Sequence, residues 1–439
     1  MPEYNQAAGS LDMHYHVFAH QSMGIVDLGA KHEWVSSLAL SIWYLMQAYV
    51  LLFGAYVLAP GLVYLLCSGR IGRLFHSWPA APVPPQTDFL LLIPAHNEEG
   101  LLPTLLASIR QLRYPAGRFR TVVVADNCTD RTALLARQAG AECLERTTAH
   151  PSSKSQALAF AAEKLGIAHA LPATVVCVLD ADCYLTPTFL TELDRHFAQP
   201  GAAPVVQCSR RVSNAFDSDV TVLDAAAEAL RQRVGAGARR LLGLESFIFG
   251  LGCCARGAVF AQLVGLPFRS LAEDKEWKAY LAQRQVPVAY CPAARLSYQA
   301  VGSGPAFQKQ RKRWLSGHWA SVRAHGLAML GQGLLRGSLS QLDFACDLLQ
   351  LPRSCLLVGA LVFGLVAAAT GQWSLVSAWV WLGLAAGLLG YGLLGLRLIG
   401  AAPRHLRVLF YGGRLVMGIV KSVVLIAAGY KAKEWDATR

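Results

Sequence analysis

Two aspartates directly follow an apolar stretch in the middle of the chain. Residues 175–179 are apolar and lead into Asp180-Ala181-Asp182, and residues i and i+2 of an extended backbone point to the same side. Two neighbouring carboxylates repel each other, and a cation bound to both would offset this repulsion. Hard oxygen ligands at a strand end suit Mg²⁺ or Mn²⁺ bridging a diphosphate. The pattern therefore predicts a metal site at Asp180 and Asp182.

The chain contains a second pair of aspartates with the same spacing, Asp217-Ser218-Asp219. This copy comes just before a helical stretch at 220–232, and acids at a helix N-terminus cap the helix and match its dipole. We therefore interpret the second copy as a helix cap, not as a metal site.

Polar groups also follow two other apolar runs. Pro94-Ala95-His96-Asn97-Glu98 ends the first run, and Asp126 ends the second, before Asn127-Cys128-Thr129-Asp130. Each segment by itself could simply cap the next helix. Three strand ends that carry acid or amide groups favour a common site over three separate caps.

Two further segments carry side chains that could take part in catalysis or binding. Glu273-Asp274 opens a helical stretch, where an acidic pair is often only a cap. Gln310, Arg313 and Trp314 place an amide, a guanidinium and an indole within five residues. A basic helix beside a membrane is commonly a lipid-contacting face, so this segment has little meaning in isolation.

The elements that position these residues alternate between strand and helix. Strands are expected at 89–94, 121–126, 174–180 and 204–208, and helices near 99–112, 130–140, 152–166 and 187–198. Buried strands alternating with helices predict a mainly parallel α/β sheet covered on both faces. Such sheets bind ligands at the carboxyl ends of their strands, where the acidic groups lie.

The composition indicates a membrane protein. Of the 439 residues 54% are hydrophobic, and residues 34–69 and 354–396 contain no charge. A helix of roughly 20 apolar residues crosses a bilayer, so the first run predicts one crossing and the second a hairpin turning near 370–373. Loop charge places that turn outside and the sheet domain in the cytosol.

Residues 404–430 are apolar but carry Arg407, Arg414 and Lys421 on one helical face, which favours an interfacial helix over another crossing.

The net charge of +12 agrees with this interpretation. Membrane proteins place Lys and Arg on cytoplasmic faces and against anionic lipid, so we expect membrane lipids as partners and no nucleic acid. The eleven cysteines are scattered without a CxxC pair, which predicts reduced, buried thiols.

Taken in order, these motifs resemble the family 2 glycosyltransferases, an inverting group that includes cellulose, chitin and hyaluronan synthases. The markers are Pro94 to Glu98, Asp126 with Asp130, Asp180-Ala181-Asp182, Glu273-Asp274 and Gln310-x-x-Arg313-Trp314. The resemblance covers about residues 86–320 and implies a GT-A, Rossmann-like cytosolic domain beside transmembrane helices. The expected segments are an extracytoplasmic part (1–35), a transmembrane helix (36–68), a Pro-rich connector (69–86), the GT-A domain (87–325), an interface helix with a transmembrane hairpin (326–400), and an interfacial or transmembrane helix with a cytosolic tail (401–439).

The resemblance also implies a role for each motif residue. Asp274 matches the general base, and the metal, Mg²⁺ or Mn²⁺, matches Asp180 and Asp182. The residues matched to nucleotide binding are Pro94, Asn97, Glu98, Asp126, Lys154 and Asp180, although Lys154 lacks the glycine that often follows it in the family. The residues matched to the diphosphate or the acceptor are Gly252, Glu273, Gln310, Arg313 and Trp314.

This inventory is chemically coherent. A glycosidase needs a second carboxylic acid to protonate its leaving group, whereas a nucleoside diphosphate can depart without a proton if a metal and Arg313 absorb its charge. The expected function is transfer from a nucleotide-sugar, with uridine as the expected nucleoside, to a glycan hydroxyl in bacterial exopolysaccharide synthesis at the inner membrane, with polysaccharide-export subunits as possible partners. The alternatives are a single-step lipid glycosyltransferase resembling ceramide glucosyltransferase, and a non-catalytic transporter or scaffold.

Overall fold

The structure is a computed structural model that describes residues 12–76, 84–149, 153–267 and 272–408, together with 418, 420–423 and 425. Its described residues form two compact units, one from 1–54 and 356–385 and the other from 55–355 and 386–439. The expected sheet domain lies in the second unit. Whether 404–430 is interfacial or crosses the membrane falls mostly outside the described residues.

An eight-stranded sheet forms the centre of the second unit, in the order β3-β2-β1-β4-β7-β6-β8-β5. β1 pairs in parallel with β2 and β4, and β2 with β3, while β7 runs antiparallel between β4 and β6. β8 is parallel to β6 and antiparallel to β5. The strands are β1 Phe89–Ala95, β2 Phe119–Asp126, β3 Glu142–Arg146, β4 Val175–Val178, β5 Cys183–Leu185, β6 Val205–Val212, β7 Cys253–Arg256 and β8 Val288–Tyr298.

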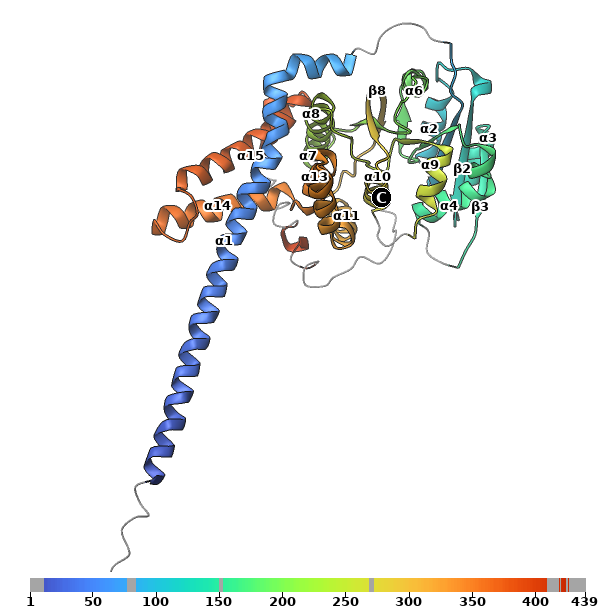
Figure 1. The fold of residues 1–439 in the computed structure, drawn as a ribbon. Coiled ribbons are helices and arrows are strands. Elements are labelled where there is room, and N and C mark those ends of the chain that lie inside the picture. The colour runs from blue at the N-terminus through green and yellow to red at the C-terminus, as the bar shows by residue number, and fades with distance from the viewer. Residues whose placement is uncertain are drawn as a thin grey trace, which may run out of the picture. The chain divides into compact units, whose positions relative to one another are not determined.

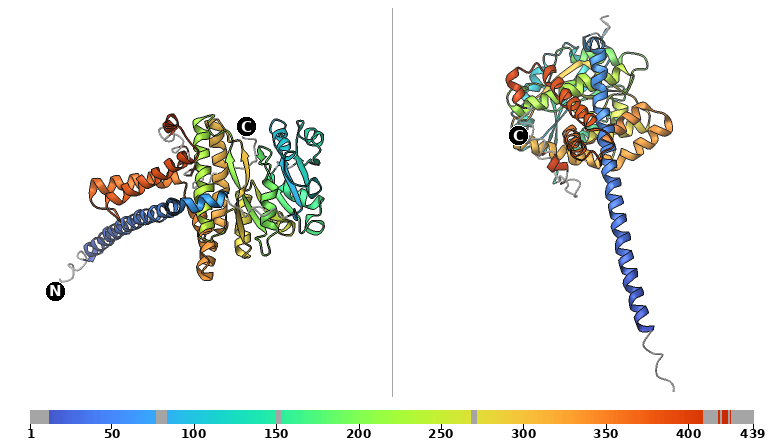
Figure 2. Two further views of the ribbon diagram at one scale, coloured as in Figure 1. Left: turned by 90° about the horizontal axis from the view of Figure 1, so that it is seen from above. Right: turned by 90° about the vertical axis from the view of Figure 1, so that its left-hand side faces the viewer.

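Helices connect and cover these strands (Figures 1 and 2). Those between β1 and β8 are α2 Leu102–Ile109, η1 Ala116–Arg118, α3 Thr132–Gln138, α4 Lys154–Lys164, α5 Ile167–Ala170, α6 Phe189–Phe197, α7 Asp219–Ala229, the π-helix η2 Leu230–Ala236, α8 Gly237–Leu241, α9 Gly257–Val264 and α10 Glu273–Gln283. After β8 come α11 Gly304–Ser321, the π-helix η3 Val322–Gly326, α12 Leu327–Arg336, α13 Leu339–Leu349, α14 Arg353–Thr370, α15 Ala378–Leu398 and η4 Pro403–Arg407, and α1 Asp12–His76 precedes the sheet.

Side chains of the central strands alternate between two cores, as the period of two requires. Phe89, Leu91 and Ile93 pack on one face with residues of α2 and α6. Leu90 and Leu92 pack on the other face with residues of α4, α9 and α10. Both faces of the sheet are therefore buried, which explains why these strands are continuous apolar runs rather than alternating ones.

The predicted α/β class is confirmed, with a sheet that is mostly parallel but mixed. The four predicted strands match β1, β2, β4 and β6, and the four predicted helices match α2, α3, α4 and α6. The other four strands were not predicted: β3 lies at a sheet edge and is partly exposed, β5 and β7 have three and four residues, and Pro292 interrupts the apolar pattern of β8.

The second pair of aspartates lies where a helix cap was predicted. Ser218 caps α7, accepting a hydrogen bond from the backbone nitrogen of Thr221, and Asp219 lies in the first turn. Asp219 also pairs with Arg407 at 3.1 Å. These contacts give this copy a structural role.

Three helices among the described residues are long and apolar enough to cross a membrane, Ser37–Arg73 within α1, α14 and α15. Within the first unit, the Trp43 indole and the Gln47 amide both donate to the carbonyl of Trp373, at 2.6 and 2.8 Å. The Gln47 side-chain oxygen accepts from the backbone nitrogen of Leu375 at 2.8 Å. The predicted turn at 370–373 is therefore present between α14 and α15, and polar side chains of α1 satisfy its backbone groups.

Candidate active site

The segment after β1 lies beside the end of β2, as the sequence predicted. The imidazole Nδ1 of His96 hydrogen bonds to the carbonyl of Asp126 at 2.7 Å. The side-chain oxygen of Asn97 accepts from the backbone nitrogen of Thr129 at 2.8 Å, and Asn97 itself has a φ of 55°. Two strand ends that are about 30 residues apart in the chain are thus joined directly.

The polar residues after β2 also act as caps. Asp130 accepts hydrogen bonds from the backbone nitrogens of Glu99 and Thr132, both at 3.0 Å, beside the start of α3. Burial alone would raise the pKa of Asp130, but the hydrogen bonds from Thr132 and Glu99 lower it, so the carboxylate is charged. The Glu98 backbone nitrogen donates to the Thr132 hydroxyl at 2.8 Å.

Asp126 is buried at the end of β2 and has an arginine partner that the sequence did not indicate. Nη1 of Arg146, in β3, lies 2.5 Å from Oδ1 of Asp126. The same guanidinium donates through Nη2 to the side chain of Gln156 in α4 at 2.8 Å. Strand pairing places Asp126 opposite Arg146, a relationship that no local sequence pattern reveals.

Four segments that are far apart in the sequence meet around the ammonium group of Lys154. Its Nζ atom lies 2.5 Å from Oδ1 of Asp180 and 3.9 Å from Oε1 of Glu273. A Cβ atom on Gly250 would lie 3.6 Å from that nitrogen and 4.0 Å from Cβ of Asp274. The start of α4, the end of β4, the loop before β7 and the start of α10 therefore form one cluster, which we call the Lys154 cluster.

Burial and charge together set the ionisation of the Lys154 cluster. Burial raises the pKa of Glu273 to about 7, an effect that Lys154 opposes and Asp274 reinforces. Burial would lower the pKa of Lys154, but Asp180 and Glu273 outweigh it and raise that pKa above the usual value. Lys154 is consequently a cation held between acidic groups.

Asp182 lies two residues after Asp180, in a turn, and its carbonyl accepts from the backbone nitrogen of Gln299 at 3.3 Å. Burial raises the pKa of the neighbouring Cys183 thiol, and the charges of Asp182 and Asp180 raise it further.

The donor set of this region fits a divalent ion that shares its coordination with a ligand. Among the described residues, no group of three or more His, Cys, Asp or Glu side chains could hold a metal by itself. Mg²⁺ in phosphate-transferring sites is held by one or two carboxylates together with substrate phosphates. Asp180, whose side chain is 36% exposed, can supply one such carboxylate, and Asp182 two residues later is the second candidate.

The two glycines before β7 have different surroundings. Gly250 has a φ of +74° and faces the Lys154 cluster. Gly252, the glycine indicated by the sequence, has a φ of +73° and packs against Leu296 and Cys208, where a Cβ atom would come within 2.9 and 3.3 Å of their side chains. Its backbone bonds to both β4 and β6, so Gly252 joins strands while Gly250 contacts the candidate site.

The loop that carries Gly250 is held by two side chains of β6, Gln207 and Arg210. The side-chain oxygen of Gln207 accepts from the nitrogen of Phe249 at 3.0 Å, and its amide nitrogen donates to the carbonyl of Leu251 at 2.9 Å. Nη1 of Arg210 donates to the carbonyl of Phe249 at 3.1 Å, and its guanidinium lies over the Phe249 ring. Neither Gln207 nor Arg210 was indicated by the sequence.

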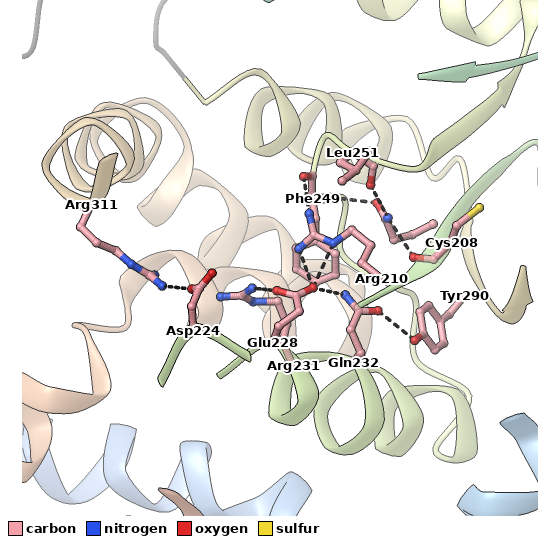
Figure 3. A network of polar contacts seen from close by, with 11 residues as sticks. Cys208, Arg210, Asp224, Glu228, Arg231, Gln232, Phe249, Leu251, Tyr290 and Arg311 are labelled. Atoms are coloured by element: carbon pink, nitrogen blue, oxygen red, sulfur yellow. Dashed lines mark hydrogen bonds and ion pairs between the residues drawn. The ribbon is translucent and has the colours of Figure 1, made fainter. Parts of the chain in front are cut away.

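Arg210 belongs to a buried polar network shown in Figure 3. Its Nη2 atom lies 2.8 Å from Oε1 of Glu228, which also pairs with Arg231 and accepts from Gln232 at 2.8 Å. Tyr290 donates to the side-chain oxygen of Gln232 at 2.9 Å. Arg231 and Gln232 lie in the π-helix η2, a rare conformation that is frequent near functional sites.

The segment with Gln310, Arg313 and Trp314 lies in α11, which contacts α10. The basic residue between them, Arg311, pairs with Asp224 of α7 at 2.5 Å and lies over the rings of Phe307 and Trp314. Trp314 keeps 40% of its surface exposed. Arg311 thus fixes this part of α11 to α7.

A family model described as "Glycosyltransferase like family 2" matches residues 84–317, more than half of the chain. The chain belongs to glycosyltransferase family 2. The matched segment contains every residue of the candidate site.

Two further proteins are similar to this chain. "Probable glycosyltransferase YdaM" from Bacillus subtilis is 26% identical over 230 residues, which are 52% of this chain and 54% of that protein. The chain thus matches about half the length of this relative. A solved mannosyltransferase from Pyrobaculum calidifontis, in complex with GDP-Man and Mn²⁺, has a similar fold, with a TM-score of 0.51, 18% identity and coverage of 86% of this chain and 99% of that one.

Glucosyl-3-phosphoglycerate synthase from Mycobacterium tuberculosis, solved with Mn²⁺ and uridine diphosphate, is more distant. Its TM-score is 0.38 at 18% identity, with coverage of 58% of this chain and 82% of that one. The comparison of folds therefore rests on the mannosyltransferase. Both solved structures contain Mn²⁺.

Proposed function

We propose that this family 2 enzyme transfers a sugar, with inversion and with Mg²⁺ or Mn²⁺, from a nucleotide-sugar to an acceptor hydroxyl. The observation that carries the proposal is the Lys154 cluster. Asp274 at the start of α10 lies in it together with Asp180 at the end of β4, although the two are 94 residues apart in the chain. An acceptor base and a diphosphate-binding carboxylate are thus close together, as a direct displacement requires.

In this mechanism Asp274 accepts the proton of the acceptor hydroxyl as its oxygen attacks the sugar carbon. Lys154 donates a hydrogen bond to Asp180, forms an ion pair with Glu273 and supplies positive charge beside the leaving diphosphate. A divalent ion bound at Asp180 and Asp182 would supply further positive charge there.

The remaining motif residues have proposed roles in binding. Pro94, Asn97, Glu98 and Asp126 form the edge where β1 and β2 end, and we assign the nucleoside, uridine, to this edge. Gln310, Arg313 and Trp314 of α11 are assigned to the diphosphate and the acceptor, with Glu273 and the loop at Gly250 and Gly252. The exposed indole of Trp314 suits stacking on a sugar ring.

We further propose that the enzyme lies in the inner membrane with its sheet domain in the cytosol. The segment limits given in the sequence analysis remain proposals. One of them is an interface helix after residue 325, and the exposed face of α12 supports it. Leu327, Leu334 and Leu335 lie on one face of this helix and are exposed, whereas Met329 is buried on the other. Such a leucine face suits a helix that lies in the lipid surface.

We propose that the product is a bacterial exopolysaccharide and that export subunits are partners of the enzyme. A single transfer to a lipid is the second candidate, because three candidate spans among the described residues are few for an export channel. The number of sugars added separates the two: a ladder of oligomers supports the polysaccharide synthase, and one glycolipid supports the lipid glycosyltransferase.

The test uses the purified full chain in lipid nanodiscs with Mn²⁺ and a panel of radiolabelled UDP-sugars and GDP-mannose. We expect nucleotide release and sugar transfer with one of these donors, abolished by chelation and by Asp182→Ala and nearly abolished by Asp274→Asn. An Asp274→Asn enzyme with full activity would remove Asp274 from its role. Transfer unaffected by chelation would overturn the metal requirement.

A further inference from the structure

A group of charged side chains outside the Lys154 cluster connects α13 to other elements of the second unit. Asp343 of α13 accepts a hydrogen bond from the Tyr56 hydroxyl of α1 at 2.8 Å. It also pairs with Arg239 of α8, whose Nε lies 2.6 Å from Oδ2, and Nη2 of Arg239 donates to the Tyr56 hydroxyl at 3.1 Å. The guanidinium of Arg239 lies 3.9 Å from the centre of the Phe247 ring. These contacts fix α13 to α1 at Tyr56.

One helical turn further along α13, Asp347 reaches the helix that carries the proposed base. Nζ of Lys275 lies 3.4 Å from Oδ2 of Asp347. Burial would raise the pKa of Asp347, but Lys275 and Arg239 outweigh it and lower that pKa, so the carboxylate is charged. Lys275 directly follows Asp274, and its backbone nitrogen donates to Oδ1 of Asp274 at 2.9 Å.

The start of α10 has no side-chain cap of its own. Its N-cap residue is Ala272, whose methyl group cannot accept a hydrogen bond. The first turn contains three acids (Glu273, Asp274 and Glu276) that repel one another. Lys275 supplies a positive charge within this turn, and its contact with Asp347 joins the turn to α13.

The rest of α10 also packs on α13. An apolar cluster joins the two helices through Ala279 and Ala282 on one side and Phe344, Ala345 and Leu348 on the other. The side-chain amide of Gln341 donates to the carbonyl of Ala282 at 2.5 Å. These contacts hold the C-terminal half of α10, whereas Lys275–Asp347 is the ion pair that holds its first turn against α13.

We propose that Lys275 and Asp347 are positioning residues that hold the first turn of α10, and with it the Asp274 carboxylate, in the orientation needed for transfer. The inference rests on the proposed role of Asp274. An ion pair with both side chains partly exposed contributes little to the stability of the fold. A small misplacement of a catalytic group, in contrast, reduces turnover strongly, so the pair should matter for rate more than for folding.

The experiment measures kcat, donor KM, nucleotide affinity and Tm for the full chain in nanodiscs. Asp347→Asn should lower kcat by about 10- to 100-fold, the range expected for a displacement near 1 Å, with donor KM and nucleotide affinity within about twofold of wild type and Tm unchanged. Asp347→Glu should restore most of the rate. The matched control is Asp88→Asn, which removes an exposed pair with Arg118 (3.2 Å) and should change neither rate nor Tm.

A double-mutant cycle makes the test specific to the pair. Lys275→Met should lower kcat as much as Asp347→Asn, and the double variant should be no slower than either single variant, because the three lose the same contact. Full kcat in Asp347→Asn, additive losses in the double variant, or a loss of kcat that follows a loss of folded protein would each overturn the inference. If wild-type protein transfers no sugar from any donor, the proposed function fails instead, before the pair is tested.

Discussion

The ammonium nitrogen of Lys154 lies 2.5 Å from a carboxylate oxygen of Asp180 and 3.9 Å from one of Glu273. Two acids from separate elements thus share one cation. This cation supplies positive charge beside the place where we propose that the divalent ion binds. The relationship implies that Lys154 and the proposed divalent ion would both compensate the charge of Asp180.

Replacing Lys154 should make the stability of the protein depend on metal. Lys154→Met leaves Asp180 and Glu273 without their shared cation, which should lower the free energy of unfolding by about 1–3 kcal/mol, less than for a fully buried pair because Asp180 is partly exposed. Added Mn²⁺ should recover part of this loss. Thermal unfolding in detergent, with chelator and with Mn²⁺, measures both effects.

Lys164→Met is the matched control, since Lys164 is an exposed lysine in the last turn of the same helix. It should leave Tm and its response to Mn²⁺ unchanged. An equal rise in Tm on adding Mn²⁺ to both variants would show that Lys154 and the ion do not compensate the same charge.

The raised pKa of Glu273 predicts a pH dependence of stability. The pKa of Glu273 rises from 4.5 to about 7, mainly because the group is buried. The charge of Lys154 lowers this pKa, and the charge of Asp274 raises it. The folded protein therefore binds more protons than the unfolded chain between these values, and the free energy of unfolding falls as pH rises through that window. Glu273→Gln should remove this fall and gain about 1–3 kcal/mol relative to wild type between pH 5 and pH 8.

Thermal unfolding of both proteins from pH 4 to pH 8 is the measurement. Glu142→Gln, which changes an exposed glutamate of β3, serves as the control and should leave the pH profile of wild type intact. Parallel profiles for wild type and Glu273→Gln would contradict the shift.

The two glycines before β7 should respond differently to the same substitution. Gly250→Ala places a methyl group at ordinary contact distance from Lys154, so its cost is mainly the backbone strain of a positive φ, about 1–2 kcal/mol. Gly252→Ala adds a 2.9 Å clash with Leu296 to the same strain, which should cost about 1–3 kcal/mol more. Tm values should therefore fall further for Gly252→Ala.

Transfer rates at a temperature where both variants are folded should show the opposite order. Gly250→Ala changes the wall of the Lys154 cluster and should be the slower enzyme. A Gly250→Ala enzyme with the wild-type rate would indicate that the loop does not contact the reacting groups.

Arg210 should be important for stability because it holds both the loop and a buried acid. Arg210→Met removes the contact with the Phe249 carbonyl and one of the two arginines around Glu228. Breaking a buried pair in this way should cost about 3–5 kcal/mol. Arg120→Met removes an exposed pair with Glu142 and should cost no more than about 1 kcal/mol. Similar Tm values for the two variants would contradict the importance of the network in Figure 3.

Much of the fold could be predicted because a sheet buried on both faces demands continuous apolar strands. Such runs end abruptly where the backbone meets water, which made Asp126 and Asp180 visible as polar groups at strand ends. The same reasoning distinguished the two pairs of aspartates by whether a strand or a helix lay next to them. The spans of the membrane helices were equally visible, since about 20 apolar residues in succession have few other uses.

The short and irregular elements could not be predicted in the same way. β7 is four residues long and pairs antiparallel between β4 and β6, so its position depends on its partners and not on a pattern of its own. For the same reason the sequence did not indicate Gln207 or Arg210. Their hydrogen bonds reach a loop about 40 residues away in the chain.

By itself the sequence determined which acids stand at the ends of strands, which segments are apolar enough for a membrane, and the order of the family's motifs. Only the tertiary structure decided that Lys154 is shared by Asp180 and Glu273, that Arg146 pairs with Asp126, and that Gly250 faces the cluster rather than Gly252. The reason is physical. Hydrophobic periodicity is local and can be seen along the chain, whereas the partner of a charge depends on strand order and on helix packing, which bring together residues that are distant in sequence.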